Sequence, residues 1–184
     1  MSDRFPLIAF HRALIPGTRH HVVTELIDLE VGATVVVALE RADGSIAGIG
    51  TSATVEGVAH RALGVVVDLI GDALVTVTQV PEGAEVTAVD RVVSPGEGLV
   101  GEAESALRSY MAARAEAGMR GDVHVTLDPD PVTASHQVAS HLEISWPEVQ
   151  DIFEAGNAGQ RLEHEIKVLR RETLLLQAVL GRST

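Results

Sequence analysis

The sequence predicts an α+β protein in which a small β barrel precedes a helical region that ends in one long helix. Two observations support this class. Up to residue 93, short runs rich in Val, Ile and Thr alternate with turns that contain Gly or Pro, as is typical of strands. From Leu99 onward, apolar residues recur at steps of three and four, as they do on one face of a helix. We therefore divide the chain into a β domain, residues 1–96, and a helical subdomain, residues 97–184.

The β half begins with an apolar run, residues 5–15 (FPLIAFHRALI), and the Pro-Gly pair after it predicts a strand followed by a turn. Residues 33–39 (ATVVVAL) are apolar on both sides, as expected for a central strand. Two strong runs, 63–69 and 73–80, are expected to form a hairpin around Gly71. About six short strands predict a closed or nearly closed barrel. The remaining predicted strands are 20–26, 46–60 and 86–93.

The helical half carries a terminal signal at each helix. The first helix is expected over 99–117, with Gly118 at the position of a C-terminal cap. Each later helix follows a side chain that can accept a hydrogen bond from the free N–H groups of the first turn. The last helix, 158–180, is the longest. The expected caps are Asp130 before Pro131, Ser145 with Glu148, and Asn157 with Gln160.

Apolar residues on the last helix form a seam at alternating steps of four and three, as in coiled coils, with the polar Thr173 as an interruption. This seam can pair with a second copy of the chain, which gives a homodimer, or with the helix at 99–117 of the same chain. Both alternatives stay open, with a slight preference for internal pairing. The seam consists of Leu162, Ile166, Leu169, Leu176 and Leu180.

Composition excludes several classes of function. The formal net charge of −12 argues against nucleic acid as a partner, because phosphate contacts need clustered Lys and Arg, and against an anionic membrane. The chain has no cysteine, which excludes disulfides and thiolate metal sites. The first residues lack the pattern of a secretory signal, and no apolar run reaches the length of a membrane span. The cytoplasm is the expected compartment.

The sequence contains no recognisable set of catalytic, cofactor-binding or metal-binding residues. Lys167 is the only lysine, and it lacks the Gly-rich turn of a P-loop. An ion pair with Glu163, four residues earlier on the helix, is the simpler interpretation of this lysine. We therefore expect neither ATP hydrolysis nor proteolysis.

Three further groups have structural explanations. His20 and His21 are neighbours on a predicted strand and would point to opposite faces, which disfavours a shared metal. The pair His136 and His141 is five residues apart, which is unfavourable for ligands on one helical face. The Pro-interleaved turn explains the two aspartates of 128–131 (DPDP) without catalysis.

The order of elements resembles a known family. The segments that carry the resemblance are FPLIAFHRALIPG, LGVVVDLIGDALVTVTQV and DPDPVTASHQVASHLEISWPEVQDIFEAGNAGQRLEHEIKVL. The last contains a helix that ends in His141-Leu142, a short acidic helix, and a long helix that opens with Arg161-Leu162-Glu163. In this order they are similar to the N-terminal substrate-recognition domain of Lon-type ATP-dependent proteases, where a PUA-like β barrel precedes a helical region.

The chain departs from the family in two places. The region between Pro16-Gly17 and Val35 lacks the Phe-Glu-x-Arg-Tyr stretch that family members usually carry. The sequence stops at Thr184, where the family continues into a motor domain. The chain is therefore expected to be either a stand-alone protein or an excised domain.

The resemblance implies a non-catalytic module that recognises exposed apolar segments of unfolded or partly unfolded polypeptides, with a protease or chaperone as a further partner. A groove between barrel and helices would hold the segment. An assembly or scaffold element that acts through the seam of the last helix is the alternative function. RNA binding would follow from PUA-like barrels in general, but the negative charge counts against it. The residues expected to contact a peptide are Phe10, Ile15, Trp146 and Phe153.

Overall fold

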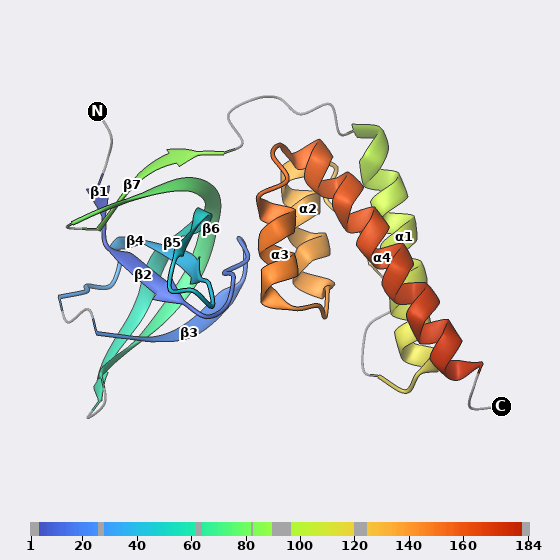
Figure 1. Cartoon of the computed structure of the whole chain (residues 1–184), viewed down its shortest axis with the longest axis horizontal. Coiled ribbons are helices and arrows are strands. Elements are labelled where there is room, and N and C mark those ends of the chain that lie inside the picture. Colours follow the sequence, from blue (N-terminus) through green and yellow to red (C-terminus); the bar gives the residue numbers. More distant parts are fainter. Residues whose placement is uncertain are drawn as a thin grey trace. The chain divides into compact units, whose positions relative to one another are not determined.

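The computed structural model describes residues 4–25, 28–61, 64–81, 83–89, 97–119 and 125–181. These ranges form a seven-stranded sheet and four helices, so the predicted α+β class with a long final helix is confirmed (Figure 1). The chain packs as two units. The first comprises Met1–Arg91 and Ile144–Glu154, and the second comprises Val92–Glu143 and Ala155–Thr184. The predicted boundary between residues 96 and 97 adjoins residues outside the described ranges, and the two-domain division stays a prediction.

The sheet of the first unit is a curled half-barrel. Its strands follow the order β1-β7-β6-β5-β4-β2, and β3 pairs separately with β6. The pair β2 and β4 is parallel, whereas the other pairs are antiparallel. The strands are β1 (Arg4–Phe5), β2 (Leu7–Phe10), β3 (Arg19–Thr24), β4 (Thr34–Glu40), β5 (Ile46–Arg61), β6 (Gly64–Val80) and β7 (Gly83–Ala88).

The predicted hairpin around Gly71 is wrong, because β6 runs through this point as one long strand. In the register with β5, Ser52 faces Ala73 and Ala53 faces Gly71, so Asp72 is the extra residue of a bulge. Glycine is needed at position 71 because the backbone at Ile15 passes close to it, and not because the chain turns there. A Cβ atom on this residue would lie 2.8 Å from the carbonyl oxygen of Ile15.

Apolar side chains alternate between the two faces of the sheet and build a cluster on each. One cluster is built around Val35, Val37, Val67 and Leu69, with Ile8 and Val22 from the two outer strands. The other is smaller and consists of Val36, Ala38, Val75, Val77 and Ala84, with Phe5, Leu7, Ile46 and Val86 only partly covered. The second cluster therefore leaves apolar surface accessible.

Helix α3 (Trp146–Phe153) packs on the sheet and belongs to the first unit. Ser145 caps it as predicted, by accepting a hydrogen bond from the Glu148 N–H. Its apolar side is buried, and the Gln150 side-chain amide donates to the Ile49 carbonyl of β5 at 2.9 Å. An ion pair of 2.9 Å between Arg41 and Glu154 holds the end of the helix beside the end of β4.

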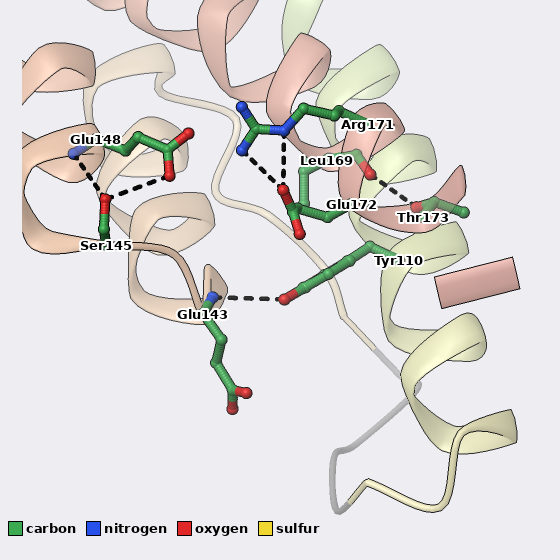
Figure 2. A network of polar contacts seen from close by, with 8 residues as sticks. All are labelled: Tyr110, Glu143, Ser145, Glu148, Leu169, Arg171, Glu172 and Thr173. Carbon is green, nitrogen blue, oxygen red and sulfur yellow. Dashed lines mark hydrogen bonds and ion pairs between the residues drawn. The ribbon is translucent and has the colours of Figure 1, made fainter. Parts of the chain in front are cut away.

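The second unit contains α1 (Glu97–Glu116), α2 (Pro131–His141) and α4 (Ala158–Leu180), with α4 packed on both other helices. The predicted caps are present, since Asp130 accepts from Thr133 N–H and Asn157 forms a full capping box with Gln160. Figure 2 shows the backbone N–H of Glu143, just after α2, donating to the Tyr110 hydroxyl of α1. The same figure shows the Thr173 hydroxyl donating to the Leu169 carbonyl within α4.

The seam of α4 is largely internal to this unit. Leu162, Ile166 and Leu169 are buried, and α4 packs along α1, as the internal alternative predicted. Leu176 and Leu180 are half-buried. The first three seam residues are therefore unavailable to a second copy. None of the described helices is both long and apolar enough to span a membrane.

Candidate functional site

The partly covered cluster of the sheet borders a hollow of about 660 Å³ in the first unit. Its apolar wall includes Phe5, Leu7 and Ile46, which are only half-buried. Its charged rim is formed by Arg4, Glu25 and Asp28, and Arg4 forms an ion pair of 3.3 Å with Glu85. Among the residues that the structure describes, no histidine, serine or lysine lines this hollow. The apolar wall of the hollow is thus suited to bind apolar side chains.

A second hollow of about 410 Å³ lies between β2 and β3 and shares Ala9 with the first. Phe10 and Val23 supply apolar surface, and the Val23 side chain is 63% exposed. The ring centroids of Phe10 and His11 lie 4.4 Å apart at 58°. The remaining lining residues are Arg12, His21 and Glu40.

The four residues expected to contact a peptide all fall in the first unit, but they divide into two kinds. Ile15 and Phe153 are 6% and 1% exposed, so both are core residues with almost no free surface. Phe10 lines the second hollow, and Trp146 is half-buried at the start of α3. The Arg12 guanidinium lies 6.0 Å from the centroid of the Trp146 ring, within the range of a cation–π interaction. Arg12 therefore connects Trp146 with the second hollow, and a peptide contact stays a prediction for Phe10 and Trp146.

The two neighbouring histidines point apart, as predicted for a strand. His20 Nε2 lies 2.9 Å from the Thr18 hydroxyl, while His21 pairs with Asp68 on β6. Burial, with the charges of Arg12 and His21, lowers the pKa of His20. Within the described residues, no group of three or more His, Asp or Glu side chains is placed to hold a metal ion.

The two aspartates before α2 have structural roles, as predicted. Asp130 accepts from the Thr133 N–H at 2.9 Å and from the Thr133 hydroxyl at 2.8 Å, and these bonds lower its pKa. Asp128 accepts from the Asp130 N–H at 2.9 Å. Lys167 and Glu163 are both exposed on α4, and the ion pair predicted between them is not among those of the described residues.

A buried polar cluster lies between α2 and α4 in the second unit. Glu165 and Arg161 are fully buried, and the Ser135 hydroxyl donates to Glu165 Oε1 at 3.0 Å. Arg161 Nε donates to the same hydroxyl oxygen at 3.3 Å, and Arg161 Nη1 donates to the Gly156 carbonyl at 3.0 Å. Burial raises the pKa of Glu165 to about 8, against the lowering effects of Ser135 and Arg161.

Neither this cluster nor the hollow between β2 and β3 was predicted from the sequence. The spacing of four residues between Arg161 and Glu165 is the same as that of an ordinary surface pair. The one local signal of their burial is that Arg161 and Glu165 each directly precede a seam residue, Leu162 and Ile166. The hollow depends on which strands pair, and this is not encoded in any single segment.

Comparison with known proteins shows what the fold resembles. No family model matches the chain, and no curated protein does. The N-terminal domain of a Lon protease from the Mycobacterium avium complex matches with a TM-score of 0.67 and 17% identity, over 91% of this chain and 98% of that one. A Lon N-terminal domain protein from Xanthomonas campestris matches with a TM-score of 0.54 and 20% identity, over 88% and 95% of the two chains. The chain thus has the fold of Lon protease N-terminal domains.

Proposed function

We propose that this chain, which shares the fold of Lon protease N-terminal domains, is a non-catalytic module that binds exposed apolar segments of polypeptides. The observation that carries the proposal is the open hollow of about 660 Å³ on the sheet, whose wall of half-buried apolar residues ends in a charged rim. Burial of such residues by a ligand is favourable, at about 25 cal/mol per Å² of apolar surface removed from water. An unfolded chain offers apolar side chains that a folded protein hides.

Non-catalytic action is supported by the residues themselves. The single lysine stands exposed in the middle of α4, without the glycine-rich turn that lets a P-loop lysine reach phosphates. Among the described residues, this hollow is lined by no serine, histidine or lysine, and its carboxylates, Glu25 and Asp28, lie exposed on the rim without a base or acid partner beside them in the lining. The purified chain is expected to leave ATP and casein unchanged and to retain no stoichiometric metal after dialysis. Turnover of either substrate would contradict this part of the proposal.

Binding is tested by calorimetry with a permanently unfolded model protein as the probe. We expect a heat of binding that saturates, and a loss of affinity in Leu7→Ala, which alters the larger hollow, and in Phe10→Ala, which alters the smaller one. Trp146→Ala, which removes the ring beside Arg12, should weaken binding as well. Val31→Ala is the matched control, because Val31 is exposed but lines neither hollow. No detectable binding at ~100 μM, which is the weak end of useful recognition, would contradict the proposal.

The same proposal implies the partners and the compartment. Unfolded or partly unfolded polypeptides are the ligands, and a protease or chaperone is the machine that the module would serve. The cytoplasm is the proposed compartment, and residues 1–96 and 97–184 are the proposed domains. Neither nucleic acid nor an anionic membrane is proposed as a partner, because the net charge of −12 repels both.

A scaffold role is the second candidate, but on a surface other than the predicted seam. Leu174, Leu175 and Val179 near the end of α4 are more than half exposed. Leu174 also borders a hollow of about 430 Å³ between α1 and α4, whose lining includes the small residues Ser105, Ala106 and Ser109. Light scattering over a range of concentrations tests this role. A dimer that becomes a monomer in Leu175→Gln would favour it, and a wild-type chain that is monomeric throughout would exclude it.

A further inference from the structure

Among the described strands, β2 has a partner on one side only. Its partner is β4, in a parallel register that places Leu7 opposite Val36. The Val36 N–H donates to the Pro6 carbonyl at 2.8 Å, so the even-numbered positions supply the ladder with β4. The backbone N–H and C=O groups of Leu7 and Ala9 therefore point away from β4, toward an edge that no described strand covers.

Strand β3 likewise has one partner within the described part of the sheet. It runs antiparallel to β6, and the Gly71 N–H donates to the Thr18 carbonyl at 3.0 Å just before the strand begins. Carried forward at a period of two, this pattern turns the even-numbered positions of β3 toward β6. The backbone groups of His21 and Val23 then face away from β6, as those of Leu7 and Ala9 face away from β4.

The two open edges border the same space. The hollow of about 410 Å³ is lined by Ala9 and Phe10 from β2 and by His21 and Val23 from β3. Ala9 also lines the larger hollow, which extends along β2 past Leu7. Through the pairings of β4, β5 and β6, the strands β2 and β3 run in opposite directions.

The geometry points to recognition by strand addition, in which an extended apolar segment of another polypeptide lies between β2 and β3 and pairs its backbone with both edges. The inference rests on the proposed function and specifies how the segment is held. Two N–H and two C=O groups on each edge, those of Leu7 and Ala9 and of His21 and Val23, alternate at the repeat of a strand, which a polypeptide backbone matches. The added strand runs parallel to one edge and antiparallel to the other.

Side chains of the added strand alternate between two environments. One set faces the side of the sheet that carries Phe10, and the other faces the side that carries Leu7 and Ile46. Backbone pairing gives affinity without a fixed sequence, while the two hollows favour apolar side chains over charged ones. This combination suits a ligand that is defined by being unfolded rather than by a motif.

Backbone recognition is tested first with altered peptides and the unaltered protein. The probe is a ten-residue peptide of alternating Val and Thr with a solubilising Lys at each end. Two comparison peptides have the same sequence, one with N-methyl groups on the odd-numbered residues and the other with N-methyl groups on the even-numbered residues. N-methylation removes N–H donors and keeps the side chains. Because alternate N–H groups of the added strand point to β2 and to β3, we expect at least tenfold weaker binding for each methylated peptide. Equal binding by all three peptides would overturn strand addition, and weaker binding by only one of the two methylated peptides would overturn pairing with both edges.

Protein variants test the location of the added strand. Ala9→Pro and Val23→Pro each remove an N–H group that no ladder of the described sheet uses, and proline is tolerated at such edge positions. The matched controls, Ala9→Ser and Val23→Thr, retain the N–H. We expect at least tenfold weaker peptide binding for the proline variants and less than twofold change for the controls, with the circular dichroism of all four unchanged. Wild-type affinity in both proline variants would overturn the location.

Hydrogen exchange gives a readout that needs no variant. The amides of Leu7, Ala9, His21 and Val23 should exchange rapidly in the free protein and slowly with the peptide bound. Unchanged exchange of these amides at saturating peptide would overturn strand addition. It would also be overturned if the wild-type chain forms a dimer, Ala9→Pro makes it a monomer, and neither binds the peptide, because the edges would then pair with a second copy of the chain. Binding of an unfolded protein alongside either result would leave the proposed function standing. Absence of binding by every polypeptide probe at ~100 μM would end both proposals.

Discussion

Glu165 is a carboxyl group whose surroundings favour its neutral form. Because burial raises its pKa to about 8, the folded chain holds a proton that the unfolded chain, with an ordinary pKa of 4.5, releases. The folded state therefore binds more protons between these values, and its free energy of unfolding falls as the pH rises, by up to about 1.4 kcal/mol per pH unit. Above pH 8 this contribution levels off.

The variant Glu165→Gln tests this linkage. Glutamine keeps the shape and an acceptor for the Ser135 hydroxyl but has no proton to lose, so the decline in stability between pH 5.5 and 7.5 should shrink. Urea unfolding at the two pH values measures it. The lowered pKa of His20 acts in the opposite direction, and it cancels when the variant is compared with the wild type. Glu163→Gln, on the exposed side of the same helix, should retain the full decline, and the idea fails if Glu165→Gln retains it as well.

Phe153 and Trp146 were predicted to share a role, but their burial separates them. Phe153→Ala should lower the free energy of unfolding by about 3–5 kcal/mol, because a fully buried aromatic leaves a cavity. Trp146→Ala removes a half-buried ring and should cost less, while it weakens polypeptide binding more. Chemical denaturation and calorimetry on the two variants measure both quantities. A larger binding loss for folded Phe153→Ala than for Trp146→Ala would reverse these assignments.

At the scale of elements, α4 has a buried half and an exposed half. Leu169→Ala should destabilise the chain by about 2–5 kcal/mol, since Leu169 is fully buried in the second unit. Leu175→Ala, six residues further along α4, should change stability by less than about 0.5 kcal/mol because its side chain is more than half exposed. Urea denaturation followed by circular dichroism compares them. Equal costs would mean that Leu175 is covered in solution, as the scaffold role requires.

The helices were predictable because their signals are local. The bounds of α4 follow from the capping box of Asn157 and Gln160, and those of α2 from Asp130 and Pro131. The prediction of a hairpin at Gly71 was wrong because glycine suits both a tight turn and a close approach of two backbone segments. Whether it is one or the other depends on Ile15, which is distant in the sequence.

The candidate site was less predictable for the same reason. The edge of β2 is open because, among the described strands, only β4 pairs with β2, and a pairing between separate segments leaves no local pattern in the sequence. Residue type alone also does not distinguish Phe153, which is buried, from Phe10, which lines a hollow. Sequence periodicity identifies the residues that avoid water, whereas long-range pairing decides which of them keep a free surface.

At the scale of the whole molecule, the net charge of −12 selects among apolar ligands. A negative potential attracts cationic chains and repels anionic ones. At the larger hollow Glu25 and Asp28 add to it, while Arg4 is paired with Glu85; at the smaller hollow Arg12 balances Glu40. We expect a peptide with a Val- and Thr-rich centre to bind about three- to tenfold more tightly with flanking lysines than with flanking glutamates at low salt.

Salt separates this field from contacts within the hollows. The screening length falls from about 30 Å at 0.01 M to about 3 Å at 1 M salt, so the preference for the lysine-flanked peptide should nearly vanish at the higher concentration. The affinity of an uncharged, glutamine-flanked peptide should hold or rise, because apolar burial is not screened. Fluorescence anisotropy of the three labelled peptides at both salt concentrations measures the two effects. If the preference for the lysine-flanked peptide survives at 1 M salt, the lysines contact particular carboxylates of the protein directly. A preference for the glutamate-flanked peptide would contradict the electrostatic argument.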